Sequence, residues 1–126
     1  MQSGGASSLL ERIQPFVAHA NLLQYVEAYL LVSDVLAQQD ATSTLDEKQC
    51  VKRSMAYGKR AYLQRRISSE ASISKLLFQN GYKLLANMGL TEAGYGDMTE
   101  RRRAVNQDFR DLSLRLERIR TAALPL

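Results

Sequence analysis

Apolar residues recur through most of this 126-residue chain at the three-and-four spacing of an α-helix. Such spacing gathers the apolar side chains of a segment on one face of the helix. No segment sustains the alternation of a half-buried strand, and the Asn80-Gly81 pair falls inside a helical pattern, where it does not mark a hairpin. The pattern predicts an all-α fold: a bundle of four main amphipathic helices with a short N-terminal helix before them.

The first helical region extends from Ser8 to Gln39. Because proline ends or kinks a helix, Pro15 should separate a short helix over residues 8–14 from a longer one that starts at Pro15 or just after it. A polar loop, Gln39–Ser43, then follows. The expected apolar face of the longer helix consists of Leu22, Tyr25, Val26, Tyr29, Val32, Ser33 and Leu36. The chain thus divides into a flexible leader (1–7), one helical domain (8–121) and a tail (122–126).

A capping box predicts the start of the second helix: Thr44 is the expected N-cap, with Glu47 three residues later and Asp46 between them. This helix should end near Arg65–Arg66, where cations suit the negative end of the helix dipole. Gly58 lies inside it and predicts close packing against another helix. The expected apolar face consists of Val51, Met55, Tyr62 and Leu63.

Ser69 is the expected N-cap of the third helix, with Glu70 in its first turn. Gly89 should lie just past its end in the left-handed conformation, with Leu90 as the apolar residue that follows. The expected apolar residues are Ile73, Leu76, Leu77, Tyr82, Leu84 and Leu85.

A loop over residues 91–97 precedes the fourth helix, for which Asp97 is the expected cap and Glu100 its partner. The apolar residues of this helix step by four, three, four and three positions, which predicts a seam that packs on other helices. They are Val105, Phe109, Leu112, Leu116 and Ile119.

The net charge of +4, from 17 Lys+Arg against 13 Asp+Glu, is compatible with an anionic partner and selects none. The basic runs Lys59–Arg60, Arg65–Arg66 and Arg101–Arg103 are interpreted as solvated helix faces. The single cysteine, Cys50, is expected to be a small buried residue. No apolar run has the length of a membrane-spanning helix and no signal peptide is visible, so we expect a cytoplasmic protein.

None of the common catalytic arrangements is present. His19 is the single histidine and Cys50 the single cysteine, so a His/Cys zinc site cannot form. No Ser-His-Asp candidate set is found either, and His19 is interpreted as a structural residue. The Gly94–Gly96 stretch is too short for a phosphate-binding loop. We therefore predict no catalytic, cofactor-binding or metal-binding residue and no cofactor.

Two features raise nucleic acid as an alternative partner. The tyrosines could stack on bases, but their helical spacing favours contacts between helices; they are Tyr25, Tyr29, Tyr57, Tyr62, Tyr82 and Tyr95. A helix-turn-helix could be placed around Ser68–Ser69, yet the helix after that turn has Lys75 as its first basic residue. Both patterns disfavour nucleic acid.

Residues 62–90 contain four short motifs in order: Arg66-Ile67, a polar turn, Ser74-Lys75-Leu-Leu-Phe78 and Asn87-Met-Gly-Leu90. This order resembles the C-terminal helical region of bacterial glycerol-3-phosphate acyltransferases. The segments on either side of this stretch are also similar to that family, so that the resemblance covers residues 9–120. They are Ile13-Gln-Pro15-Phe16, Val26-Glu-Ala-Tyr29 with Val32, and Arg101–Arg103 through Ile119.

The resemblance implies an enzyme that transfers an acyl chain from acyl-CoA or acyl-carrier protein to the sn-1 hydroxyl of glycerol 3-phosphate. That chemistry uses a His-x-x-x-x-Asp motif in the family's catalytic domain. Here Gln24 stands where the Asp would follow His19, so no catalytic residue is carried over. The expectation is a fragment, an excised domain or a separate subunit.

Two functions follow as expectations. In the first, the chain is a non-catalytic domain that packs on the acyltransferase catalytic domain. Its basic runs would then lie near an anionic membrane surface, at the inner face of the cell membrane. In the second, it is an independent helical adaptor that binds proteins or nucleic acid. No oligomeric state is predicted.

Overall fold

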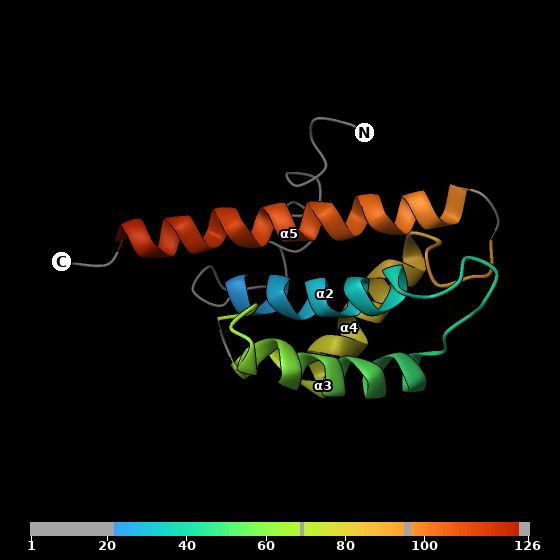
Figure 1. Ribbon diagram of the computed structural model, residues 1–126, viewed down its shortest axis with the longest axis horizontal. Coiled ribbons are helices and arrows are strands. Elements are labelled where there is room, and N and C mark those ends of the chain that lie inside the picture. Colours follow the sequence, from blue (N-terminus) through green and yellow to red (C-terminus); the bar gives the residue numbers. More distant parts are fainter. Residues whose placement is uncertain (1–21, 69, 95–96, 124–126) are drawn as a thin grey trace.

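The computed structural model describes residues 22–68, 70–94 and 97–123 (Figure 1). Its elements are α2 (Leu22–Ala37), α3 (Glu47–Leu63), the single 3-10 turn η3 (Glu70–Ser72), α4 (Lys75–Asn87) and α5 (Asp97–Ala123). Within these ranges no strand occurs, and the predicted all-α fold with four main helices is confirmed. The expected leader, the short helix over residues 8–14 and the start of the first long helix lie outside the described residues.

Helix α2 lies at the centre of the described bundle, between α5 on one side and α3 on the other, with α4 crossing behind it (Figure 1). A single apolar face was expected here, and that expectation was too narrow. Ala28, Leu30, Leu31 and Val35 are buried as well, because the other three helices surround α2. A helix that is covered on nearly every side needs apolar residues on nearly every side.

The start of α3 corrects the predicted capping box. Asp46 is the N-cap, not Thr44: its Oδ1 accepts a hydrogen bond from the backbone N–H of Gln49 at 2.8 Å. Leu45, directly before the cap, is buried in the core. Burial of Leu45 fixes the entry of the chain, so the next side chain able to accept becomes the cap.

The inner face of α3 is lined by small side chains. Cys50, Ser54, Gly58 and Ala61 are buried, whereas the expected core residues Tyr62 and Leu63 are exposed. The prediction of close packing at Gly58 is confirmed, because a Cβ added there would lie 3.2 Å from Leu31 Cδ1 and 3.4 Å from Ile73 Cγ1. Small residues let α3 approach its neighbours. Of the four expected apolar residues, Val51 is buried and Met55 is partly buried, and only Tyr62 and Leu63 point outward.

Helix α4 begins later than expected. Residues Glu70–Ser72 form only the 3-10 turn, and the α-helix starts at Lys75 with Ser74 as its N-cap; the expected cap Ser69 lies outside the described residues. Leu76 is 64% exposed, so its predicted place in the core is wrong. Its place is taken by Phe78, which is fully buried.

The end of α4 confirms the prediction for Gly89 and Leu90. Gly89 has φ of 75°. Its N–H donates to Ala86 O, and the Leu90 N–H donates to Leu85 O, the two hydrogen bonds of a Schellman motif. Helix α3 ends by the same motif with Arg65 at φ of 60° in the glycine position. An L-residue in this conformation costs roughly 1–2 kcal/mol.

This pair of helix ends gives a matched test. Gly89→Ala is expected to lower the free energy of unfolding by about 1 kcal/mol, because alanine is strained at positive φ. Arg65→Gly should raise it by less than about 1 kcal/mol, because relief of the same strain exceeds the entropy that glycine adds to the unfolded chain. Urea denaturation measures both values. A change of the same sign in the free energy of unfolding of both variants would contradict the assignment of strain to these two left-handed positions.

Helix α5 packs chiefly on α2. Asp97, the expected N-cap, is its first helical residue and lies in the first turn with Glu100. Phe109 and Leu112 of the expected seam are buried, and Val105 and Leu116 are partly buried; the side chain of Ile119 lies outside the described set. Among the described residues, no helix combines the length and the apolar character needed to cross a membrane.

Candidate functional site

Two carboxylates lie on α2, seven positions apart and both buried. Glu27 accepts hydrogen bonds from the segment that connects α3 to α4. Its Oε2 accepts from the Ser68 N–H at 2.8 Å and from Ser68 Oγ at 2.9 Å, and its Oε1 accepts from Ser72 Oγ at 2.9 Å. Glu27 therefore holds the segment between α3 and α4 against α2.

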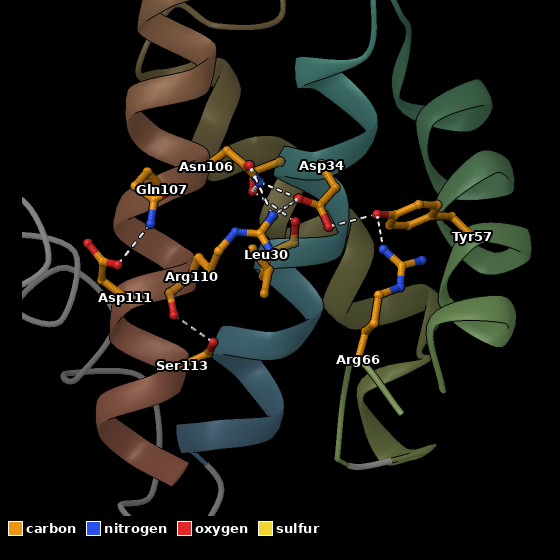
Figure 2. A network of polar contacts seen from close by, with 10 residues as sticks. Leu30, Asp34, Tyr57, Arg66, Asn106, Gln107, Arg110, Asp111 and Ser113 are labelled. Atoms are coloured by element: carbon orange, nitrogen blue, oxygen red, sulfur yellow. Dashed lines mark hydrogen bonds and ion pairs between the residues drawn. The ribbon is translucent and has the colours of Figure 1, made fainter. Parts of the chain in front are cut away.

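Asp34 joins three helices (Figure 2). One of its oxygens, Oδ1, accepts from Asn106 Nδ2 and from Arg110 Nη2 of α5, the latter at 3.1 Å. The other, Oδ2, accepts from the Tyr57 hydroxyl of α3 at 3.0 Å. Asn106 Nδ2 also donates to Ser33 Oγ at 2.8 Å.

This network extends to the surface through Tyr57. Arg66 Nη1 donates to the Tyr57 hydroxyl at 2.9 Å, and the guanidinium lies over the ring, with Cζ 5.0 Å from its centroid. Arg110 and Arg66 are exposed, so the network is screened by solvent at both margins. The buried part, around Asp34, fixes the relative positions of α2, α3 and α5.

Arg102 corrects the interpretation of Arg101–Arg103 as a solvated face. Its side chain is only 3% exposed, whereas Arg101 and Arg103 are exposed. It donates to three backbone carbonyls: Leu90 at 2.9 Å, Glu92 at 3.0 Å and Asp40 at 3.3 Å. Burial lowers its pKa, and the nearby charge of Asp40 opposes that shift. The side chain ties the loop after α2 to the loop after α4.

Cys50 is fully buried, which confirms the expectation of a small core residue. Burial raises the pKa of its thiol to about 11, so at neutral pH the thiol remains protonated. Since the thiolate is the nucleophile in cysteine chemistry, Cys50 is not an activated residue.

Among the described tyrosines, Tyr29 and Tyr57 make contacts between helices, as predicted. Tyr29 meets Tyr25 and Phe109 edge to face, with ring centroids 6.4 Å and 6.1 Å away. Tyr82 donates its hydroxyl hydrogen to Leu45 O at 2.7 Å. Tyr62 is exposed; Tyr95, like His19, lies outside the described residues.

The geometry does not support a helix-turn-helix. Helix α3 ends at Leu63 and α4 starts at Lys75, with a 3-10 turn bonded to Glu27 between them. A helix-turn-helix needs a turn of only a few residues between its two helices. This segment is instead part of the packed bundle.

Two open hollows lie on the described surface. One, of about 490 Å³, is lined by Tyr62, Leu63, Arg65, Ile67 and Ser68. The other, of about 230 Å³, is lined by Met88, Leu90, Arg101, Ala104 and Val105. Neither lining contains a carboxylate or an imidazole that could serve as a general base. Over the described residues, no group of three His, Cys, Asp or Glu side chains is placed to hold a metal ion.

Sequence reasoning missed the residues that organise this interior: Glu27, Asp34 and Arg102. One signal was available for the first two. Charged residues seven positions apart in an otherwise apolar helix share a face, and on α2 that face is buried. Arg102 gave no such signal, since it stands in a run of three arginines.

A sequence model described as "Glycerol-3-phosphate acyltransferase C-terminal region" matches residues 2–94 of the chain. The matched range contains α2, α3, η3 and α4, together with Glu27, Asp34 and the serines that Glu27 binds. Helix α5 lies beyond its end. No solved structure matches the chain.

Proposed function

The chain belongs to the family of glycerol-3-phosphate acyltransferase C-terminal regions, and on that premise we propose that it packs on the catalytic domain of such an enzyme without contributing catalytic groups. Membership makes it a helical domain of an acyltransferase that acts in phospholipid synthesis. Two points are our proposal: that the chain docks on a catalytic domain, and that it contributes no catalytic group.

The partners of the buried charged side chains support a non-catalytic role. Glu27, Asp34 and Arg102 each bind groups of this same chain and hold its segments together. A general acid or base has to reach a substrate atom, directly or through one water. These three side chains face the interior between helices, where they stabilise the bundle.

The proposal is tested by reconstitution without lipid. The purified chain should show no transfer of an acyl group to glycerol 3-phosphate. Mixed with the separately produced catalytic portion of a glycerol-3-phosphate acyltransferase from the same source, it should co-elute as a complex in size-exclusion chromatography. Acyl transfer by the chain alone, or separate elution of the two proteins, would refute the proposal.

Leu76 is the expected contact of α4 in that complex, because it is 64% exposed and lies inside the range that matches the family. Burial of one leucine stabilises a contact by roughly 1.5–3 kcal/mol. Leu76→Ser should therefore weaken the complex by at least about tenfold, measured by titration calorimetry. Leu114 of α5 is 52% exposed and lies outside the matched range, so Leu114→Ser is the control and should leave the affinity unchanged.

A further inference from the structure

The outer face of α3 has one sign of charge. Between Lys48 and Ser68 the sequence contains no Asp or Glu. Six exposed cations of this stretch form what we call the basic face of α3: Lys48, Lys52, Arg53, Lys59, Arg60 and Arg65. Arg66 is also exposed, but it is engaged with Tyr57. Helix α5 differs, because it mixes its arginines with Asp97, Glu100, Asp108, Asp111 and Glu117.

An apolar group lies on the same face. Lys52, Lys59 and Leu63 follow one another by seven and four positions, which places them on one line along the helix. Leu63 is 79% exposed. Beside it opens the hollow of about 490 Å³, whose lining also includes Tyr62 and Arg65. The opposite side of α3, with Cys50, Ser54 and Ala61, is buried in the bundle.

We propose that the basic face of α3, with Leu63, binds the surface of a bilayer that contains anionic lipid. Rows of Lys and Arg are attracted to anionic headgroups. A leucine at the same level can enter the boundary between headgroups and acyl chains. Helix α3 lies on the opposite side of α2 from α5, at the margin of the described bundle (Figure 1), so the face can lie flat against such a surface.

The exposed leucine distinguishes this partner from a nucleic acid. A phosphate backbone offers charge to the six cations but no apolar layer to Leu63, since contacts to phosphate and sugar are polar. A bilayer offers both. This inference goes beyond the docking on a catalytic domain and does not depend on it, because the chain alone carries every residue involved.

The first test is sedimentation of the full chain with vesicles. It should bind vesicles of equal parts phosphatidylcholine and phosphatidylglycerol, and this binding should weaken as salt is added. Vesicles of phosphatidylcholine alone should bind far less. Equal binding to both compositions would overturn the proposal. So would tighter binding to a short DNA duplex than to the anionic vesicles at the same salt concentration, which would assign the face to nucleic acid.

Charge variants locate the surface. Lys52→Gln/Lys59→Gln/Arg60→Gln should weaken binding to the anionic vesicles on the order of 100-fold at low salt, because each cation near the surface contributes about fivefold. The control Arg103→Gln/Arg115→Gln/Arg118→Gln removes the same charge from exposed positions of α5. It should weaken binding by less than about fivefold, through long-range attraction alone. Equal losses in the two triple variants would refute the assignment to α3.

A second pair of variants tests the apolar part. Leu63→Ser should weaken binding by about tenfold, as expected for a leucine that leaves water. Leu114→Ser, at an exposed leucine of α5, should leave it unchanged. Equal affinities of wild type and Leu63→Ser would show that the face is held by charge alone and would overturn the insertion of Leu63. All variants change exposed side chains, and thermal unfolding verifies that each one is folded.

Discussion

Phe109→Ala is expected to lower the free energy of unfolding by about 3–5 kcal/mol, the range observed for large core aromatic residues. Phe109 is fully buried and meets the ring of Tyr29 edge to face at 6.1 Å. It stands at the middle of the surface by which α5 packs on α2. The truncation would leave a cavity between these helices and remove the aromatic contact.

Urea denaturation followed by circular dichroism measures this loss. Leu114→Ala is the matched control, because it shortens an exposed residue of the same helix and should change stability by less than about 0.5 kcal/mol. Domains of this size are stabilised by only about 5–15 kcal/mol, so Phe109→Ala should unfold at a clearly lower urea concentration than the wild type. Equal effects of the two variants would show that α5 is not held through this seam.

Arg102→Met is expected to lower the free energy of unfolding by about 3 kcal/mol. The change keeps an unbranched side chain but leaves three carbonyl groups, those of Asp40, Leu90 and Glu92, without their donor. A buried acceptor left unsatisfied costs about 1–3 kcal/mol. Some carbonyl groups of the two loops can bind water after the substitution, and this reduces the total loss of stability.

The neighbouring position provides the control for Arg102. Arg103→Met makes the same replacement at an exposed residue and should change stability by less than about 0.5 kcal/mol. Arg102→Lys should not restore the loss, because an ammonium group lacks the planar set of donors that reaches several carbonyls at once. A full rescue by lysine would show that only the charge matters at this position.

Periodicity located the helices because each packs an apolar stripe against its neighbours. The seam around Phe109 and the left-handed Gly89 follow from local rules, and both were predictable from spacing and residue type alone. The starts of α3 and α4 differ from the predicted ones, since a second residue able to cap follows the expected one: Asp46 after Thr44, and Ser74 after Ser69. Burial of Leu45 decided for Asp46, and the contacts of Glu27 with Ser68 and Ser72 delayed the start of α4 to Lys75.

The orientation of α3 could not be predicted from its apolar residues. Its inner face carries Cys50, Ser54, Gly58 and Ala61, which a count of large apolar residues overlooks. These small side chains are buried because α3 lies close to Leu31 and Ile73. The distance between α3 and these residues is set only when the bundle assembles. The exposed position of Leu63 is the direct result.

The buried polar contacts lay beyond sequence reasoning for a related reason. Asp34 and Arg110 stand 76 positions apart, and Glu27 and Ser72 stand 45 positions apart. Each group gains a partner only when distant segments meet. A charged residue in isolation predicts exposure. The spacing of Glu27 and Asp34 indicates a shared face but not the partners that bury them, and Arg102 carries no signal of its own.

The central position of α2 has a consequence for the speed of folding. This helix belongs to the first part of the described chain, yet its partners reach as far as α5 at the other end of it. Bundles whose helices pack mostly on sequence neighbours fold in microseconds to milliseconds, and distant pairings slow the process. Until α5 has been synthesised, the apolar stretch from Tyr29 to Leu36 lacks its largest cover, and a newly made chain is then most prone to aggregate.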